Sequence, residues 1–187
     1  SSNMSKGYIE KILRARVYDV ARETPVDEAF LLSQRLDNRV WLKREDLQPV
    51  FSFKLRGAYN KMCRLSEAER AAGVIAASAG NHAQGVALAA RHLGIDAVVV
   101  MPNITPDIKV EAVRKLGATV VIEGDDFDES CSIALRMAEQ QGRVFIHPYD
   151  DPQVIAGQGT IALEMLETWP DLDVLVIPIG GGGLIAG

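Results

Sequence analysis

Residues 74–101 read VIAASAGNHAQGVALAARHLGIDAVVVM, and this stretch predicts the fold class. Two short apolar runs, 74–77 and 97–101, flank a helical segment that we expect to end at Gly94, because glycine enters the left-handed conformation cheaply. Strand, helix and strand of this length are typical of a βαβ unit with parallel strands and a right-handed crossover. The chain is therefore predicted to be an α/β protein with a mostly parallel sheet.

The same alternation continues on both sides of this unit. Further strands are predicted at 40–43, 119–122, 144–146 and 174–177. Helix starts are predicted at Ser66 with Glu69 as a capping box, at Thr105-Pro106 with proline in the first helical position, and at Asp126 with Glu129 for a helix over 127–141. Further glycines are expected where helices end, at Gly73, Gly117 and Gly142.

The composition excludes several classes of protein. Of the 187 residues, 48% are hydrophobic and 24% are charged, which is ordinary for a folded protein. The net charge of −5 argues against nonspecific binding to nucleic acid or to an anionic membrane surface. No apolar run approaches the ~18–20 residues of a membrane span, and no Cys/His spacing resembles a zinc or other metal site. With only Cys63 and Cys131, we expect no disulfide framework and a reducing, cytoplasmic location.

Active sites in parallel sheets lie at the carboxyl ends of strands, and three segments in such positions carry chemistry. The first is SFKLRGA at 52–58, in which Lys54 stands between Phe53 and Leu55. If those side chains pack around it, dehydration lowers the pKa of the amine and makes it a usable nucleophile or base. The alternative is a solvated lysine at the start of a helix.

The second segment is SAGNHAQG at 78–85, which directly follows the predicted strand 74–77. Small residues let several backbone N–H groups point at one spot at a helix N-terminus, which suits a carboxylate or a phosphate. Asn81 and His82 add neutral donors. The alternative is simple helix capping by Ser78 or Asn81.

The third segment is the glycine run at 180–183, which follows an apolar stretch. Four consecutive glycines are costly in chain entropy, so they indicate a backbone that closely approaches a ligand, most often a phosphate. The alternatives are a flexible linker or a loose dinucleotide fingerprint, Gly181-x-Gly183-x-x-Ala186. A helix normally follows such glycines, and we expect none here, so we interpret the chain as truncated at its C-terminus.

Together the three segments meet the needs of pyridoxal phosphate chemistry on an amino acid: an amine for the aldehyde, bare backbone for the phosphate and a cradle for the substrate carboxylate. They resemble the fold-type II pyridoxal phosphate enzymes, and within them the threonine deaminases (threonine ammonia-lyases). KREDLQPV at 43–50 and VIAGQGT at 154–160 add to a resemblance that covers 17–187.

The resemblance implies a role for each matching residue, with pyridoxal 5'-phosphate as cofactor. Lys54 would hold the aldehyde as a Schiff base and act as the base on the substrate Cα–H; Phe53 would pack near the pyridine ring and Asn81 would bind the cofactor's 3' oxygen. The phosphate would be bound by Gly180, Gly181, Gly182, Gly183 and the N–H of Leu184. The substrate carboxylate would be surrounded by Ser78, Ala79, Gly80, Asn81 and His82.

It also implies an architecture of mostly parallel sheets in two domains. Residues 1–72 would be the first part of a large domain, 73–150 a smaller inserted α/β domain, and 151–187 the incomplete return to the large domain. The site would lie in the cleft between the domains, and the partner of the pyridine nitrogen would lie after Gly187. The complete protein is expected to be a homo-oligomer, a dimer or tetramer.

The implied activity is deamination of L-threonine, and less readily of L-serine, by loss of the β-hydroxyl, with a small amino acid as the only expected ligand besides the cofactor. Racemases and serine dehydratases of the same family are the near alternative. Family racemases carry a second serine where Ala79 stands, and tend to have asparagine in place of Tyr149; alanine cannot deliver a proton, so Ala79 favours elimination. The segment at 48–52 resembles the biosynthetic deaminases of isoleucine synthesis, whose allosteric domain binds isoleucine and would be missing here.

Two alternatives come from other classes. A nicotinamide-dinucleotide-binding dehydrogenase domain would use the glycine loop but leaves 52–58 and 78–85 unexplained. A non-catalytic amino-acid-binding module would keep the carboxylate cradle and tolerate the loss of Lys54.

Overall fold

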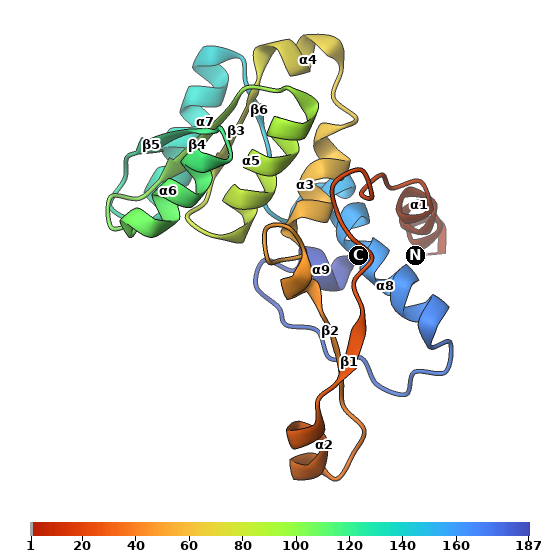
Figure 1. Cartoon of the computed structure of the whole chain (residues 1–187). Coiled ribbons are helices and arrows are strands. Elements are labelled where there is room, and N and C mark those ends of the chain that lie inside the picture. The colour runs from red at the N-terminus through yellow and green to blue at the C-terminus, as the bar shows by residue number, and fades with distance from the viewer. Residues whose placement is uncertain (1) are drawn as a thin grey trace.

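A computed structural model describes residues 2–187 and contains a four-stranded parallel sheet (Figure 1). The strand order is β5-β4-β3-β6. The strands are β3 (Val74–Ala77), β4 (Ala97–Met101), β5 (Thr119–Ile122) and β6 (Val144–Phe145). Val74 pairs with Ala97 on one side and with Val144 on the other. Because the order places β3 between β4 and β6, the residues that follow β3 and β6 emerge side by side at one edge of the sheet.

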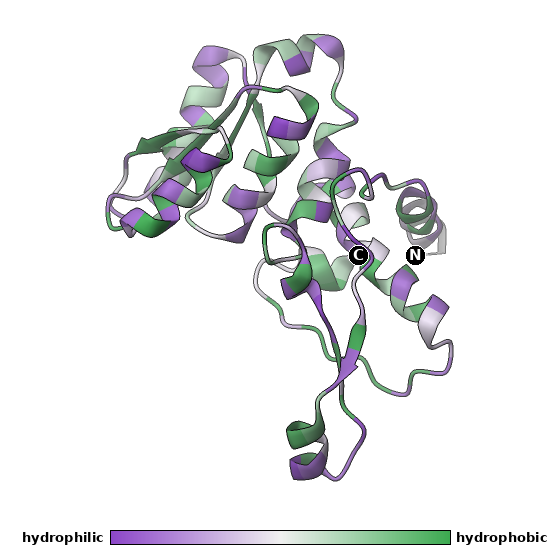
Figure 2. Ribbon diagram, in the orientation of Figure 1, coloured by the Kyte–Doolittle hydropathy of each residue, from purple (hydrophilic) through white to green (hydrophobic). Residues whose placement is uncertain are grey.

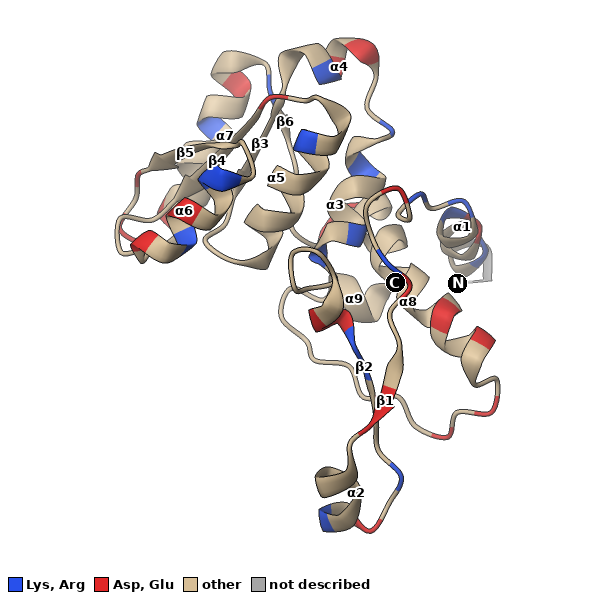
Figure 3. Ribbon diagram, in the orientation of Figure 1, with Lys and Arg blue, Asp and Glu red and all other residues tan. Residues whose placement is uncertain are grey.

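Helices cover both faces of this sheet. They are α5 (Asn81–Leu93), α6 (Asp107–Lys115) and α7 (Phe127–Gln141). Val74 and Ala76 pack in a core with α5 and α6. Ile75 and Ala77 point to the opposite face and pack against α7, as the alternation of side chains along a strand requires. Figure 2 shows the sheet strands in the green of apolar residues, and Figure 3 places the charges on helices and loops instead.

The rest of the chain is mostly helical. Its elements are α1 (Ser2–Leu13), β1 (Val26–Glu28), α2 (Phe30–Leu36), β2 (Trp41–Lys43), the 3-10 turn η1 (Glu45–Leu47), α3 (Lys54–Met62), α4 (Glu67–Ala72), α8 (Pro152–Thr168) and α9 (Gly183–Ala186). The antiparallel strands β1 and β2 carry α2 at their tip as a projecting arm (Figure 1). None of the helices within 2–187 is both long and apolar enough to cross a membrane.

Helices α3 and α8 cross in close contact because glycines face each other at the crossing. A Cβ on Gly157 would stand 2.5 Å from the carbonyl oxygen of Arg56 and 2.6 Å from the Cα of Gly57. A Cβ on Gly57 would stand 2.5 Å from the side-chain nitrogen Nε2 of Gln158. The Gln158 side chain accepts a hydrogen bond from the Gly57 N–H at 3.0 Å. This crossing sets the position of α3, whose first residue is Lys54.

Several elements predicted from the sequence are confirmed. Four predicted elements coincide with observed ones: the strands at 74–77, 97–101 and 119–122 and the helix over 127–141. The strands predicted at 40–43 and 144–146 are also present, but each observed strand is one residue shorter than predicted. Ser66 and Glu69 form the expected capping box. Asp126 caps α7 by accepting from the Glu129 N–H at 2.8 Å. The Glu129 carboxylate, however, accepts from Asp125 rather than from Asp126.

Other expectations are wrong. Residues 174–177 form no strand: a strand needs a hydrogen-bonded partner, none of the described residues pairs with them, and Val176 is 86% exposed. Pro106 precedes α6 as its N-cap instead of opening it. A short helix, α9, does begin at Gly183, the last glycine of the run. The sequence patterns did not predict α1, β1, α2 or α8. The division into domains at 1–72, 73–150 and 151–187 stays a prediction.

Candidate active site

Lys54 is the first residue of α3, and its amine lies in a partly dry position. The Nζ donates a hydrogen bond to the carbonyl oxygen of Pro148 at 3.1 Å and lies 5.5 Å from the centre of the Phe53 ring. Leu55 is fully buried beside it. Burial lowers the pKa of Lys54, as expected for a cation that loses water. The structure thus favours the packed lysine over the solvated one.

The turn between β3 and α5 holds the second segment. The Ser78 Oγ accepts hydrogen bonds from the N–H groups of Gly80 at 3.1 Å and Ala83 at 3.3 Å. The N-cap residue of α5 is Gly80, so neither Ser78 nor Asn81 is a simple N-cap. The Ser78 oxygen nevertheless accepts from two N–H groups at this helix start, and its own O–H remains available as a donor. Asn81 begins α5 and is exposed. The positive end of the helix dipole at this turn favours a carboxylate nearby.

His82, one residue further, is buried and neutral. Its Nε2 lies 2.9 Å from the carbonyl oxygen of Ile146, and since a carbonyl only accepts, the ring proton sits on Nε2. Burial lowers the pKa of His82 to about 4; the hydrogen bond to Ile146 opposes this shift and the charge of Lys54 adds to it. His82 and Lys54 hydrogen-bond to the carbonyl oxygens of Ile146 and Pro148, two residues apart, so the first two segments meet.

Gly85 brings these two segments into contact. A Cβ at Gly85 would stand 3.1 Å from the carbonyl carbon of Lys54 and 3.1 Å from the backbone nitrogen of Leu55. These are backbone atoms, which cannot move aside as a flexible side chain can. The glycine therefore lets α5 lie against the start of α3, with the lysine at the junction.

The glycine run reaches the same place through Tyr149. A Cβ on Gly181 would overlap the Tyr149 ring, and one on Gly183 would stand 3.0 Å from the Tyr149 Cβ. Gly182 has a φ of +92°, a conformation that side chains disfavour. The bare backbone of the run thus lies on the residue that follows Pro148, whose carbonyl accepts from Lys54.

The structure brings together some predicted site residues and leaves others apart. Lys54, His82 and the run at 180–183 all contact the segment 146–149. Within residues 2–187, no hydrogen bond joins Asn81 or Leu184 to Lys54. The roles that the resemblance assigns to these two residues, and to every other predicted site residue, stay predictions.

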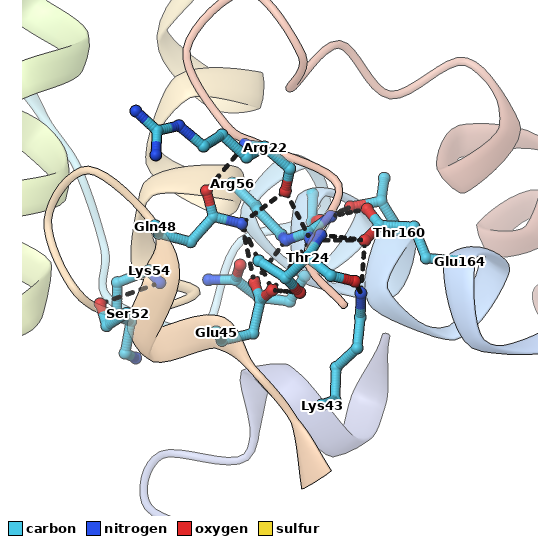
Figure 4. Close-up of polar contacts among 12 residues, drawn as sticks. Arg22, Thr24, Lys43, Glu45, Gln48, Ser52, Lys54, Arg56, Thr160 and Glu164 are labelled. Carbon is cyan, nitrogen blue, oxygen red and sulfur yellow. Dashed lines mark hydrogen bonds and ion pairs between the residues drawn. The ribbon is translucent and has the colours of Figure 1, made fainter. Parts of the chain in front are cut away.

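A buried ionic network next to Lys54 was not anticipated (Figure 4). Its centre is the guanidinium of Arg56, a side chain with no exposed surface, two residues along α3 from the lysine. Arg56 donates to Glu45 at 2.6 Å, to Thr160 at 2.9 Å and to Glu164 at 2.9 Å. Lys43 donates to the same Glu164 at 2.7 Å. The network ties the 3-10 turn η1 and helix α8 to the first turn of α3.

The charges within this network stabilise one another. Burial alone would raise the pKa of Glu164, but hydrogen bonds from Arg56 and Lys43 hold it below its ordinary value. Two members of the network could have been suspected from the sequence. Lys43 opens the charged run at 43–46, and Arg56 is a charged residue at an otherwise apolar helix start. Glu164 offered no such signal, because a glutamate in a helix is usually solvated.

Comparison with known proteins places this site in context. The sequence model of the family described as "Pyridoxal-phosphate dependent enzyme" matches residues 17–187. Threonine dehydratase 1 biosynthetic, chloroplastic, of Solanum lycopersicum is 58% identical over 181 residues, and L-threonine dehydratase biosynthetic IlvA of Escherichia coli is 53% identical over 180. Each match covers 96% of this chain, but only 30% and 35% of those relatives.

Solved structures are similar as well. The processed form of threonine deaminase isoform 2 from Solanum lycopersicum has a TM-score of 0.95 and 53% identity, over 99% of this chain and 54% of that one. Maize serine racemase has a TM-score of 0.90 and 36% identity, over 95% of this chain and 54% of that one. The fold described above is thus shared with both.

Proposed function

Because the chain belongs to the pyridoxal-phosphate dependent enzyme family, we propose that it is the amino-terminal part of the catalytic domain of a threonine dehydratase (threonine ammonia-lyase). The reaction would convert L-threonine, and L-serine less well, to a 2-oxo acid and ammonia, and threonine would yield 2-oxobutanoate. Relatives at 53% and 58% identity that are named biosynthetic threonine dehydratases support this substrate and a place in isoleucine biosynthesis.

The single observation that carries the proposal is the state of Lys54. Its amine is half-buried, its pKa is lowered by burial, and it lies beside an aromatic ring. These are the properties that an amine needs to attack an aldehyde near neutral pH. The glycine run on Tyr149 supports the placement of an anionic group nearby, since it presents main chain without side chains. The residues present therefore fit pyridoxal phosphate.

Once joined to the amino nitrogen of the substrate in place of Lys54, pyridoxal phosphate would make the Cα–H acidic, because its ring spreads the developing negative charge. The chain's own groups do the rest. The bare backbone at 180–183 binds the phosphate, and the turn at 78–82 orients the substrate carboxylate at the start of α5. The Lys54 amine, whose pKa is lowered by burial, takes the Cα proton. The β-hydroxyl then takes up the proton that Lys54 removed and departs as water. The released enamine reacts with a second water to give the 2-oxo acid and ammonia.

Ala79 supports elimination over racemisation. Racemisation needs an acid on the opposite face of the substrate, and a methyl side chain cannot deliver a proton. Serine racemase of maize shares 36% identity with the chain, against 53% for the tomato threonine deaminase. A nicotinamide-dependent dehydrogenase or a binding module without catalysis gives the half-buried Lys54 no role, and the family match disfavours both.

The tests use the complete protein that contains this chain, because the chain spans 30–35% of its relatives. Keto-acid release is measured with L-threonine, L-serine and D-serine. We expect the highest rate with L-threonine; release of only the mirror-image amino acid from serine would overturn the lyase proposal. Borohydride reduction with pyridoxal phosphate should attach the cofactor to the peptide that contains Lys54. A trapped adduct of the same yield in Lys54→Ala would overturn that assignment.

Partners and location belong to the same proposal. The complete enzyme would bind a small amino acid, would be a homo-oligomer, and would bind neither nucleic acid nor membrane. We propose a cytoplasmic location; among the relatives, however, the tomato protein is named chloroplastic, and a threonine dehydratase of Saccharomyces cerevisiae, 54% identical over 183 residues, is named mitochondrial. Size-exclusion chromatography with light scattering tests the oligomer, and cell fractionation tests the location.

A further inference from the structure

The segment at 146–149, directly after β6, is where the three parts of the site meet. Two of its carbonyl oxygens accept hydrogen bonds, one from His82 at 2.9 Å and one from Lys54 at 3.1 Å. Its tyrosine ring supports Gly181. The shape of this short segment therefore sets the distance between the lysine, the carboxylate turn and the glycine run.

His147 holds this segment in shape. Its Nδ1 accepts hydrogen bonds from the backbone N–H groups of Tyr149 at 3.2 Å and Asp150 at 2.8 Å. Its ring also packs edge-on against Phe145 and Tyr149, with centroids 6.1 and 4.6 Å apart. The side chain thus joins the end of β6 to the turn that follows.

Asp151, four residues later, accepts hydrogen bonds in the same pattern as His147, and aspartate is common as such an acceptor. The Asp151 side chain accepts from the N–H groups of Gln153 at 2.8 Å and Val154 at 3.3 Å, and so caps α8. At both places a side-chain acceptor takes the N–H groups two and three residues ahead, which is the usual work of Asp, Asn or Ser. In His147 an imidazole nitrogen does this work, and the neutral ring must then carry its proton on Nε2.

We propose that His147 is a positioning residue for the proposed reaction: its Nδ1 fixes the turn that presents the Pro148 carbonyl to Lys54 and the Tyr149 ring to the glycine run. It touches neither substrate nor cofactor in this role. The effect of His147 on the reaction rests on the proposed function. Its effect on the turn, through an imidazole nitrogen that accepts two hydrogen bonds, does not depend on that function.

Two variants separate the acceptor from the bulk of the side chain. In His147→Asn the amide oxygen occupies nearly the place of Nδ1 and keeps the acceptor. In His147→Leu the volume remains but the acceptor is lost. Both are made in the complete enzyme. The first measurement is hydrogen exchange at the backbone amides of Tyr149 and Asp150 without cofactor.

We expect exchange at both amides to rise roughly tenfold in His147→Leu, the scale of a lost hydrogen bond, and to stay near the wild-type rate in His147→Asn. The second measurement is the pH midpoint for labelling of Lys54 by trinitrobenzenesulfonate, again without cofactor. It should rise toward that of an ordinary lysine in His147→Leu only. Lys109, which is exposed on α6, serves as the internal control and should not change.

The third measurement is the affinity for pyridoxal phosphate, which should fall about tenfold or more in His147→Leu and recover in His147→Asn. An equal loss of affinity in both variants, or no loss in either, would overturn the proposed role of His147 as an acceptor. If wild-type enzyme fails to capture pyridoxal phosphate, the proposed function fails. Amide exchange and lysine labelling then still decide the role of His147, because neither uses the cofactor.

Discussion

The guanidinium of Arg56 and the carboxylate of Glu164 lie in direct contact although 108 residues separate them in the sequence. Both residues are buried, with exposed fractions of 0% and 4%. Arg56 follows Lys54 by two residues on α3, whereas Glu164 stands on α8. The pair therefore links the helix that begins with Lys54 to the helix that packs across it.

Loss of Arg56 should strongly destabilise the protein. In Arg56→Met, the buried Glu164 and the partly buried Glu45 lose their main cation, and breaking a buried pair on one side costs roughly 3–5 kcal/mol. Urea unfolding followed by circular dichroism measures the change in free energy. Arg114→Met is the matched control, since Arg114 and Glu111 form an exposed pair at 2.9 Å and such pairs contribute about 0–1 kcal/mol. Equal losses in the two variants would contradict the prediction.

Substitution of glycine by alanine should lower the stability of the protein at one helical position and raise it at another. In Gly57→Ala the new Cβ would stand 2.7 Å from the Val154 carbonyl oxygen, a backbone atom, so α3 and α8 must separate. We expect a loss of roughly 1–3 kcal/mol. In Gly7→Ala the new Cβ meets open space within α1, and alanine should stabilise the helix by about 0.5–1 kcal/mol. Thermal unfolding of both variants tests this, and a shift of the same sign in both would count against the helix crossing described here.

The stability of the protein should fall as the pH drops from about 6.5 to about 4. The pKa of His82 is lowered by burial to about 4 from an ordinary value of 6.5, so in this range the unfolded state binds the proton and the folded state does not. The free energy of unfolding should decrease by up to about 3 kcal/mol across the range. Urea unfolding at several pH values measures the slope.

His82→Gln is the control for that experiment. The glutamine amide reaches about as far as Nε2 and can donate to Ile146, but it does not titrate. The slope between pH 6.5 and 4 should flatten in this variant. An unchanged slope would assign the acid sensitivity to other groups.

Lys54 should capture pyridoxal phosphate at a lower pH than an ordinary lysine does. Only the uncharged amine attacks an aldehyde, and burial lowers the pKa of Lys54, so its reactive fraction is larger near neutral pH. The measurement is the initial rate of borohydride-trapped adduct between pH 7 and 11 in the complete enzyme. A midpoint at or above about 10.4, the value of a free lysine, would contradict the prediction. Lys54→Arg should give no adduct, because a guanidinium does not form one.

A hydroxyl introduced at position 79 should bring some racemisation. In Ala79→Ser the complete enzyme gains a proton donor where the family's racemases have one, so D-serine should form from L-serine beside the keto acid. Chiral chromatography of the amino-acid pool measures it. Ala79→Gly changes the same position without adding a hydroxyl and should form no D-serine. Absence of D-serine from both variants would show that Ala79 does not choose between the two outcomes.

Much of the fold and the chemistry could be predicted from local patterns. The apolar runs of β3, β4 and β5, the glycines after helices and the caps at Ser66 and Asp126 act over a few residues, so their effect can be read in the sequence. Lys54, the turn at 78–82 and the glycine run are recognisable for the same reason, since each is a short motif with its own chemistry. Local patterns fail where an apolar run has no strand to pair with, and residues 174–177 are such a run.

How these motifs are placed against one another depends on contacts between residues far apart in the chain. The network of Arg56 and Glu164 and the role of His147 arise only when α3, α8 and the end of β6 meet. No local pattern encodes which distant side chain will satisfy a buried charge or a backbone N–H, because that choice follows from the path of the whole chain and the exclusion of water from its interior. The motifs could thus be found by reading along the sequence, whereas their assembly into one site required the packed helices and the turn at 146–149.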